Sequence, residues 1–140
     1  MNSVLVPVDG SECSLRAVRY LIDGWREGRR PTLHLLNVQP ALTGDVSQFV
    51  ARTDIKDYHK EMSAEALQPA RDLLETAGIG YQEHAEVGHV PDLIVQCAER
   101  LRCDHIVMGT HGRSALADAL AGSTTVKVLH LTRVPVVLVK

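Results

Sequence analysis

The chain has 140 residues and a formal net charge of −2, so we expect one domain over residues 1–140 and no binding of nucleic acid through bulk positive charge. Hydrophobic residues make up 45% of the sequence and charged residues 23%, which is typical of a globular protein, and the 4% of aromatic residues predicts an aliphatic core. The sequence contains no apolar stretch long enough to span a bilayer and no leader of charged and then apolar residues. We therefore expect a cytoplasmic protein without membrane contacts.

The three cysteines, Cys13, Cys97 and Cys103, are widely spaced and odd in number, which argues against a disulfide framework or a CxxC redox pair. Cys97 falls on the apolar face of a predicted helix, where a free cysteine is expected to pack in the core. Cys13 lies near the start of the first predicted helix. Two interpretations stay open for it, a packed side chain or a reactive thiol, because helix N-termini lower the pKa of a thiol.

The first predicted strand covers residues 3–8, a continuous aliphatic run that is typical of a strand buried on both faces of a parallel sheet. Pro7 near its end indicates that strand pairing finishes there. A turn over residues 9–11 leads into a helix that starts at residue 11 or 12 and ends near Gly28. The buried stripe of that helix is formed by Leu15, Val18, Ile22 and Trp25.

Residues 32–38 form the second predicted strand. The segment 39–53 shows neither a helical nor a strand period, so we interpret it as a loop. A helical pattern follows from about residue 54, and Pro69 inside it predicts a kinked helix or two shorter ones. Residues 79–86 hold a third strand whose weak alternation suggests the edge of a sheet.

The second half of the chain continues the same alternation of helix and strand. Pro91 is placed in the first turn of a helix, and residues 105–108 form the next strand. Ser123 is the predicted N-cap of a last helix over residues 126–131, and Val136–Val139 is the last strand. The alternation predicts an α/β domain with a parallel sheet and right-handed crossovers.

The segment 105–125 contains the clearest functional pattern. Gly109 closes a buried strand, and Gly112 and Gly122 follow in the loop and at a helix start. Glycines allow a ligand to approach the backbone, and a helix N-terminus offers unpaired N–H groups to an anion such as phosphate. The hydroxyls of Ser123, Thr124 and Thr125 could donate further hydrogen bonds to such an anion. Arg113 or His111 could add positive charge. The alternative is an ordinary glycine-containing loop before a capped helix.

The spacing Gly109-x2-Gly112-x9-Gly122-Ser123 resembles the ATP-binding signature of the universal stress protein family. Residues 4–22 are similar to the first strand and helix of the family, and residues 134–140 to its last strand. Shorter similarities cover residues 35–38 and 87–91. The resemblance implies a doubly wound, five-stranded parallel sheet of order 3-2-1-4-5, a Rossmann-like fold of the HUP type.

In such a fold the ligand crevice lies where the strand order reverses, so Asp9 after the first strand should face Gly109 after the fourth. The resemblance places the nucleoside near Pro7, Asp9 and Val38, with the Val38 backbone reading adenine. Asp9 has a rival interpretation as the cap of the first helix or its turn, and Arg113 as a solvated loop cation. The complete predicted site is Pro7, Asp9, Val38, Met108, Gly109, Gly112, Arg113, Gly122, Ser123, Thr124 and Thr125.

The resemblance implies a protein that binds ATP as a regulatory ligand in the stress response. The sequence lacks GxxxxGK[ST], GxGxxG and HExxH motifs, so neither a P-loop, a nicotinamide enzyme nor a protein-held metal site is expected. A Mg²⁺ ion would be held mainly by phosphates and water, with Asp9 at most a partner. We identify no catalytic residue. The alternatives are a slow ATP hydrolase or phosphotransferase, and a nucleotide-free dimeric scaffold.

The last strand, Val136–Val139, is short and aliphatic and should lie at an edge of the sheet. An apolar edge is a liability unless it is paired, so we expect a homodimer through antiparallel pairing of this strand, as the resemblance also implies. The sequence does not identify the stress, a protein client, or which adenine nucleotide is preferred.

Overall fold

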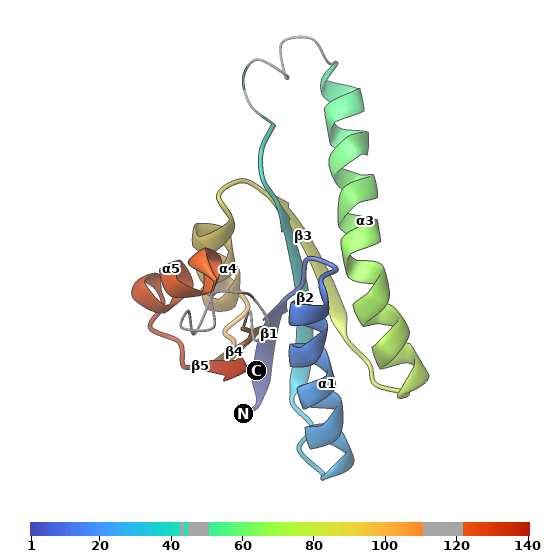
Figure 1. Ribbon diagram of the computed structural model, residues 1–140, viewed down its shortest axis with the longest axis vertical. Helices are drawn as coiled ribbons and strands as arrows, with labels where there is room; N and C mark the ends of the chain where they lie inside the picture. The colour runs from blue at the N-terminus through green and yellow to red at the C-terminus, as the bar shows by residue number, and fades with distance from the viewer. Residues whose placement is uncertain (43, 45–50, 111–121) are drawn as a thin grey trace.

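The computed structural model describes residues 1–42, 44, 51–110 and 122–140. Strands and helices alternate along the chain (Figure 1), and five parallel strands form one sheet in the order β3-β2-β1-β4-β5. The elements are β1 (Ser3–Pro7), α1 (Glu12–Arg26), β2 (Thr32–Gln39), α3 (Arg52–Thr76), β3 (Gln82–Val87), α4 (Val90–Arg100), β4 (His105–Gly109), α5 (Ser123–Leu131) and β5 (Val136–Val139). The predicted α/β class, the strand order and the edge positions of β3 and β5 are confirmed.

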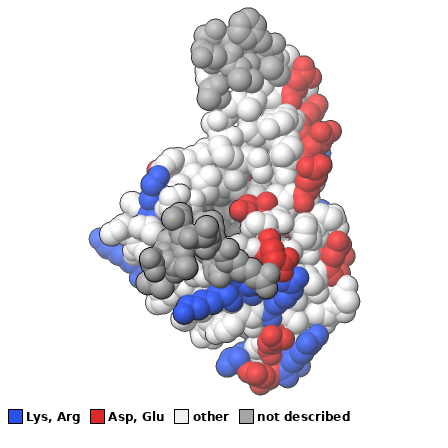
Figure 2. Space-filling model, viewed as in Figure 1, with Lys and Arg blue, Asp and Glu red and all other residues white. Residues whose placement is uncertain are grey.

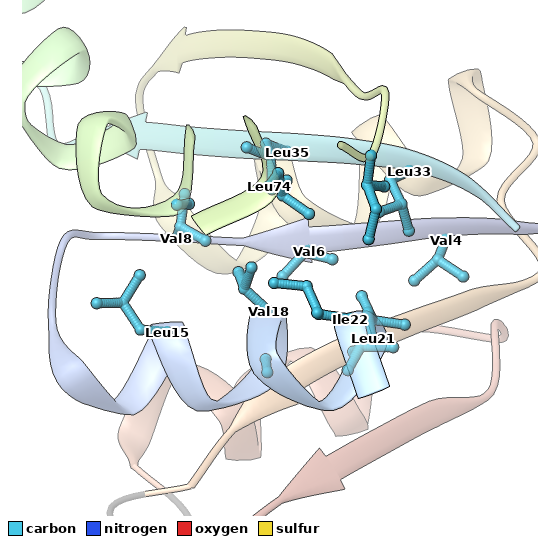
Figure 3. Packing of buried hydrophobic residues seen from close by; sticks show 14 of the residues in the cluster. Val4, Val6, Val8, Leu15, Val18, Leu21, Ile22, Leu33, Leu35 and Leu74 are labelled. Carbon is cyan, nitrogen blue, oxygen red and sulfur yellow. The ribbon is translucent and has the colours of Figure 1, made fainter. Parts of the chain in front are cut away.

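Helices cover both faces of the sheet, which explains why its central strands are continuously aliphatic. Val4 and Val6 of β1 pack with α1 and α3, whereas Leu5 between them packs with α4 and α5 on the other face. Figure 3 shows the first of these two clusters. Its labelled side chains are Val4, Val6, Val8, Leu33 and Leu35 from the sheet side, Leu15, Val18, Leu21 and Ile22 from α1, and Leu74 from α3.

The turn from β1 into α1 is tightly specified. Gly10 has φ +85°, a conformation that other residues rarely adopt, and a Cβ there would lie 3.4 Å from Cα of Ala66 in α3. Ser11 is the N-cap of α1, and its hydroxyl accepts the backbone N–H of Ser14 at 3.3 Å. The start of α1 is therefore stabilised by its own Ser11 cap and by the contact of the turn with α3.

Of the two alternatives predicted at Pro69, the division into two shorter helices is wrong, because α3 runs through this residue as one helix of 25 residues. Proline removes one backbone hydrogen bond from a helix interior. The side chains on either side, Leu67, Ala70 and Leu74, are buried in the cluster that packs on the sheet and hold the helix in place. Packing therefore outweighs the local penalty of the proline.

Helix α5 begins at Ser123, three residues earlier than predicted, and its N-cap is Gly122 rather than Ser123. Gly122 has an extended backbone (φ −68°, ψ 168°), and its carbonyl accepts the N–H of Val126 at 3.0 Å. Because that bond already closes the first helical turn, Ser123 lies inside the helix.

Other predicted boundaries move as well. β3 starts at Gln82 rather than at residue 79, and Ile79 packs in the core ahead of it. β2 extends through Gln39 and α3 begins at Arg52, so the predicted loop 39–53 shortens; within it, residues 43 and 45–50 lie outside the described part of the chain.

Helix α3 extends beyond the sheet at one end of the molecule (Figure 1), and its outer face is acidic. Asp54, Asp57, Glu61 and Glu65 recur every three or four residues and so lie on one side of the helix. Figure 2 shows the resulting column of acidic side chains along α3. Within the described residues, no helix combines the length and apolarity needed to cross a bilayer.

A pair of histidines lies between β2 and β3 on the face that α4 covers. Nδ1 of His34 and Nε2 of His84 are 3.0 Å apart, so one ring donates a hydrogen bond and the accepting ring has to be neutral. Burial lowers the pKa of His34, and the neighbouring imidazole lowers it further. Burial also lowers the pKa of His84, with help from the Arg100 guanidinium. The unfolded chain therefore binds protons that the folded chain does not.

We expect the free energy of unfolding to decrease as the pH falls through the ordinary histidine range, from about 7.5 to about 5.5. Replacing His84→Gln keeps a hydrogen-bonding side chain but removes one titrating group, so the decrease should become shallower by up to about 1.4 kcal/mol per pH unit. Urea denaturation at a series of pH values measures this slope. The control is His130→Gln, an exposed histidine of α5. An unchanged slope in His84→Gln would contradict the interpretation.

Candidate functional site

A pocket of about 400 Å³ opens at the carboxyl ends of β1 and β4, a volume within the range of small-molecule sites. Every predicted site residue that the structure describes lines this pocket: Pro7, Asp9, Val38, Met108, Gly109, Gly122, Ser123, Thr124 and Thr125. The structure thus brings together residues that are more than a hundred positions apart. Gly112, Arg113 and His111 lie outside the described residues.

The position of the pocket follows from the sheet topology. β1 pairs with β4 through Val4↔His105 and Leu5↔Ile106, so the two strands end at the same edge of the sheet. The connection after β1 leads to β2 on one side of the sheet, and the connection after β4 leads to β5 on the other side. The crevice lies between β1 and β4, where the two connections leave in opposite directions.

Sequence reasoning missed much of the apolar wall. Leu36 of β2 lies on the same strand face as Val38, two residues along, and Val90 and Ile94 are one turn apart on α4. Met108 completes this wall. The spacings were visible in the sequence, but they are those of ordinary core residues, and only the packing of α4 over β2 places them at the pocket.

Asp9 is held by two hydrogen bonds to one of its carboxylate oxygens. Oδ1 accepts the Ser11 backbone N–H at 2.9 Å and the Ser14 hydroxyl at 3.1 Å. Burial alone would raise the pKa of Asp9, but the hydrogen bonds from Ser11 and Ser14 outweigh it and hold the pKa below its ordinary value. Asp9 therefore caps the turn, as one interpretation of the sequence had it, and lines the pocket as well, whereas the N-cap of α1 is Ser11.

The end of β1 is anchored by a buried amide that sequence reasoning also missed. Asn37 of β2 is 1% exposed, and its Nδ2 donates to the Val8 carbonyl at 2.8 Å. Its Oδ1 accepts a hydrogen bond from Gln39 at 2.8 Å. A polar residue inside an aliphatic strand was the available signal, because a buried amide needs partners.

Gly109 is required by the close approach of α1 to the end of β4. A Cβ at this position would lie 1.9 Å from the Cys13 carbonyl oxygen, a clash with backbone. The Cys13 Sγ donates to the Thr110 carbonyl at 2.8 Å, and the Arg16 guanidinium donates to the same oxygen. Burial raises the pKa of Cys13, partly offset by Arg16, which argues against the reactive-thiol interpretation.

The pocket combines two kinds of polar group. The first turn of α5, Ser123 to Thr125, presents backbone N–H groups that lack partners within the helix, together with hydroxyls. Asp9 is the one charged side chain among the described lining residues. In the described part of the chain no three or more His, Cys, Asp or Glu side chains cluster so as to hold a metal ion. The arrangement can accept an anion at α5 and a hydrogen-bond donor at Asp9.

A sequence model described as the universal stress protein family matches residues 1–140. The chain belongs to the universal stress protein family. The universal stress protein MJ0531 of Methanocaldococcus jannaschii is 31% identical to it over 145 residues, covering 99% of this chain and 82% of the relative.

Solved structures of universal stress proteins share the fold. The structure of MJ0577, also from Methanocaldococcus jannaschii, superposes with a TM-score of 0.80 at 27% identity and covers 99% of this chain and 95% of the other. A universal stress protein solved in complex with cAMP superposes with a TM-score of 0.70 at 28% identity. The match covers 99% of this chain and 97% of the other. The five-stranded sheet described above is thus the architecture of the family.

Proposed function

We propose that this universal stress protein binds an adenine nucleotide, ATP, as a regulatory ligand, and does so as one cytoplasmic domain. The observation that carries the proposal is the pocket at β1 and β4, where an apolar wall and the N-terminus of α5 line one cavity of about 400 Å³. A planar apolar base and a phosphate anion are the two parts of a nucleotide that need such surroundings. The relative solved with cAMP supports an adenine nucleotide.

The parts of the nucleotide are assigned by chemistry. The base packs on the wall formed by Leu36, Val38 and Ile94, which line the pocket, and the Val38 backbone reads its edge. The phosphates lie at Gly122 and the first turn of α5, because the ionised Asp9 repels them from its side of the pocket. A Mg²⁺ ion, if bound, is held by the phosphates and water, with Asp9 as the available carboxylate.

Replacing Gly122→Val should weaken ATP binding at least about ten-fold, since a side chain there enters the phosphate position. The extended backbone of Gly122 suits valine, so the fold is expected to persist. Equilibrium binding of labelled ATP measures the effect.

The matched control is Gly80→Val, because Gly80 has open space around its Cβ position. Equal affinity of wild type and Gly122→Val would refute the placement of the phosphates. A wild type that binds no adenine nucleotide would favour the nucleotide-free scaffold.

Rapid hydrolysis of ATP is not expected. Phosphoryl transfer needs strong positive charge at the γ-phosphate and an oriented nucleophile. The sequence offers only Arg113, His111 and Lys127 as cations for this site, and the Asp9 carboxylate already accepts two hydrogen bonds. Steady-state phosphate release should stay below about 1 per second, whereas a turnover of ~1–100 per second would establish an enzyme. Measured at ATP concentrations below the dissociation constant, release that is unchanged in Gly122→Val would come from a contaminating ATPase.

We also propose a homodimer formed through β5. The bonds from Ile106 N–H to the Pro135 carbonyl and from Thr110 N–H to the Val139 carbonyl tie this strand to β4. Because backbone groups alternate in direction along a strand, those of Val136 and Leu138 point away from β4. Leu138 is 37% exposed, so the edge is apolar as well as open, and a second copy of the strand would cover it.

Replacing Leu138→Pro removes an outward N–H without removing a bond to β4, so the protein should become monomeric while unfolding remains cooperative. Light scattering at micromolar concentration measures the mass. Leu138→Thr keeps the backbone donor and should stay dimeric. A wild type that is monomeric under these conditions would refute the dimer.

A further inference from the structure

We propose that Ser14 is a positioning residue for the ligand: its hydroxyl fixes the Asp9 carboxylate by one oxygen and leaves the other for a hydroxyl or amino donor of the bound molecule. The identity of that molecule as a nucleotide rests on the function proposed above. The orientation of Asp9 by Ser14 does not.

The geometry around Ser14 is that of a side chain enclosed between the turn and the pocket. Ser14 is 7% exposed and lines the pocket from the first turn of α1. Its Oγ lies 3.1 Å from Oδ1 of Asp9, 3.0 Å from the Ser11 carbonyl and 3.4 Å from the Asp9 backbone N–H. A hydroxyl has one hydrogen to donate, and an ionised carboxylate is a stronger acceptor than a carbonyl. The hydrogen therefore goes to Asp9.

The chemistry of the ligand follows from the remaining oxygen. The bonds from the Ser11 N–H at 2.9 Å and the Ser14 hydroxyl at 3.1 Å both end on Oδ1, which leaves Oδ2 available to a donor of the ligand. An ionised carboxylate oxygen only accepts, which selects an O–H or N–H group and disfavours phosphate at this point. In a nucleotide the groups that qualify are the ribose hydroxyls and the amino group of the base.

The hydroxyl of Ser14 is not needed for the helix. The N-cap bond at the start of α1 runs from the Ser14 backbone N–H to the Ser11 hydroxyl, at 3.3 Å, and alanine at position 14 would retain it. Alanine also has the highest helix propensity. Ser14→Ala therefore removes the contact with Asp9 and leaves the local backbone bonds in place.

The first measurement is the pKa of the Asp9 carboxyl in the ligand-free protein, by carbon-13 NMR titration. It should lie below the ordinary value in the wild type and rise in Ser14→Ala. The matched control is Ser63→Ala, a buried serine of α3 outside the pocket, which should leave the Asp9 pKa unchanged. An unchanged Asp9 pKa in Ser14→Ala overturns the positioning role, whether or not nucleotide binds. Ser14→Cys, of similar size with a weak donor, provides the same test if Ser14→Ala does not fold.

The second measurement is nucleotide affinity in a double-mutant cycle. In the wild-type background, Ser14→Ala should weaken ATP binding about ten-fold, the size expected for a hydrogen bond to a charged group. In the Asp9→Asn background, the same substitution should weaken ATP binding by less than about two-fold. A loss of equal size in both backgrounds would overturn the inference, because Ser14 would then act without Asp9.

Two ATP analogues identify the donor. If it is a ribose hydroxyl, the loss caused by Ser14→Ala disappears with 2′,3′-dideoxy-ATP; if it is the base amino group, the loss disappears with purine riboside triphosphate. A loss that persists with both analogues overturns the assignment of the donor. A raised Asp9 pKa in Ser14→Ala, in a protein that binds no nucleotide, refutes the proposed function and leaves the positioning role standing.

Discussion

The pairing of β1 with β4 is the contact on which the pocket depends. It places Asp9 and Gly109 at one edge of the sheet although a hundred residues separate them. The close approach of α1 to the end of β4 completes this junction, since the Cys13 carbonyl occupies the space where a side chain at position 109 would lie. Arg16 and Cys13 then hold the Thr110 carbonyl from the same helix. The contact between β1 and β4, which joins the two halves of the sheet, thus also forms the base of the pocket.

The described lining of the pocket has a negative group on one side and the positive end of a helix dipole on the other. The described lining offers one carboxylate, on the β1 side, and one helix N-terminus, at Gly122 and Ser123. A molecule with an anionic part and a hydrogen-bond donor satisfies both groups, whereas a simple anion satisfies one. Burial by itself would raise the pKa of Asp9, but the hydrogen bonds from Ser11 and Ser14 in the turn outweigh it, so the carboxyl stays ionised at neutral pH.

Much of the fold was predictable because a strand that is buried on both faces of a sheet has a continuous run of aliphatic residues. The aliphatic runs at β1 and β4 identified buried strands, and glycines after them identified the turns. The errors lie where tertiary packing outweighed a local preference. Pro69 did not interrupt α3, whose neighbouring side chains are buried, and Gly122 rather than Ser123 became the N-cap of α5 because its carbonyl closes the first turn.

The sequence by itself determined the class of the fold, since strand and helix periodicity are local properties of the chain. Its resemblance to the universal stress protein family supplied the strand order and the pocket positions Pro7, Asp9 and Val38. The tertiary structure decided which side chains surround that backbone. Asn37 and Ser14 carry no motif, and their roles exist because β2 lies beside β1 and the first turn of α1 lies over Asp9. Asn37 lies 29 positions from its partner Val8, so its role depends on a contact between separate strands. Ser14 lies five positions from Asp9, and its role depends on the fold of the turn that joins β1 to α1.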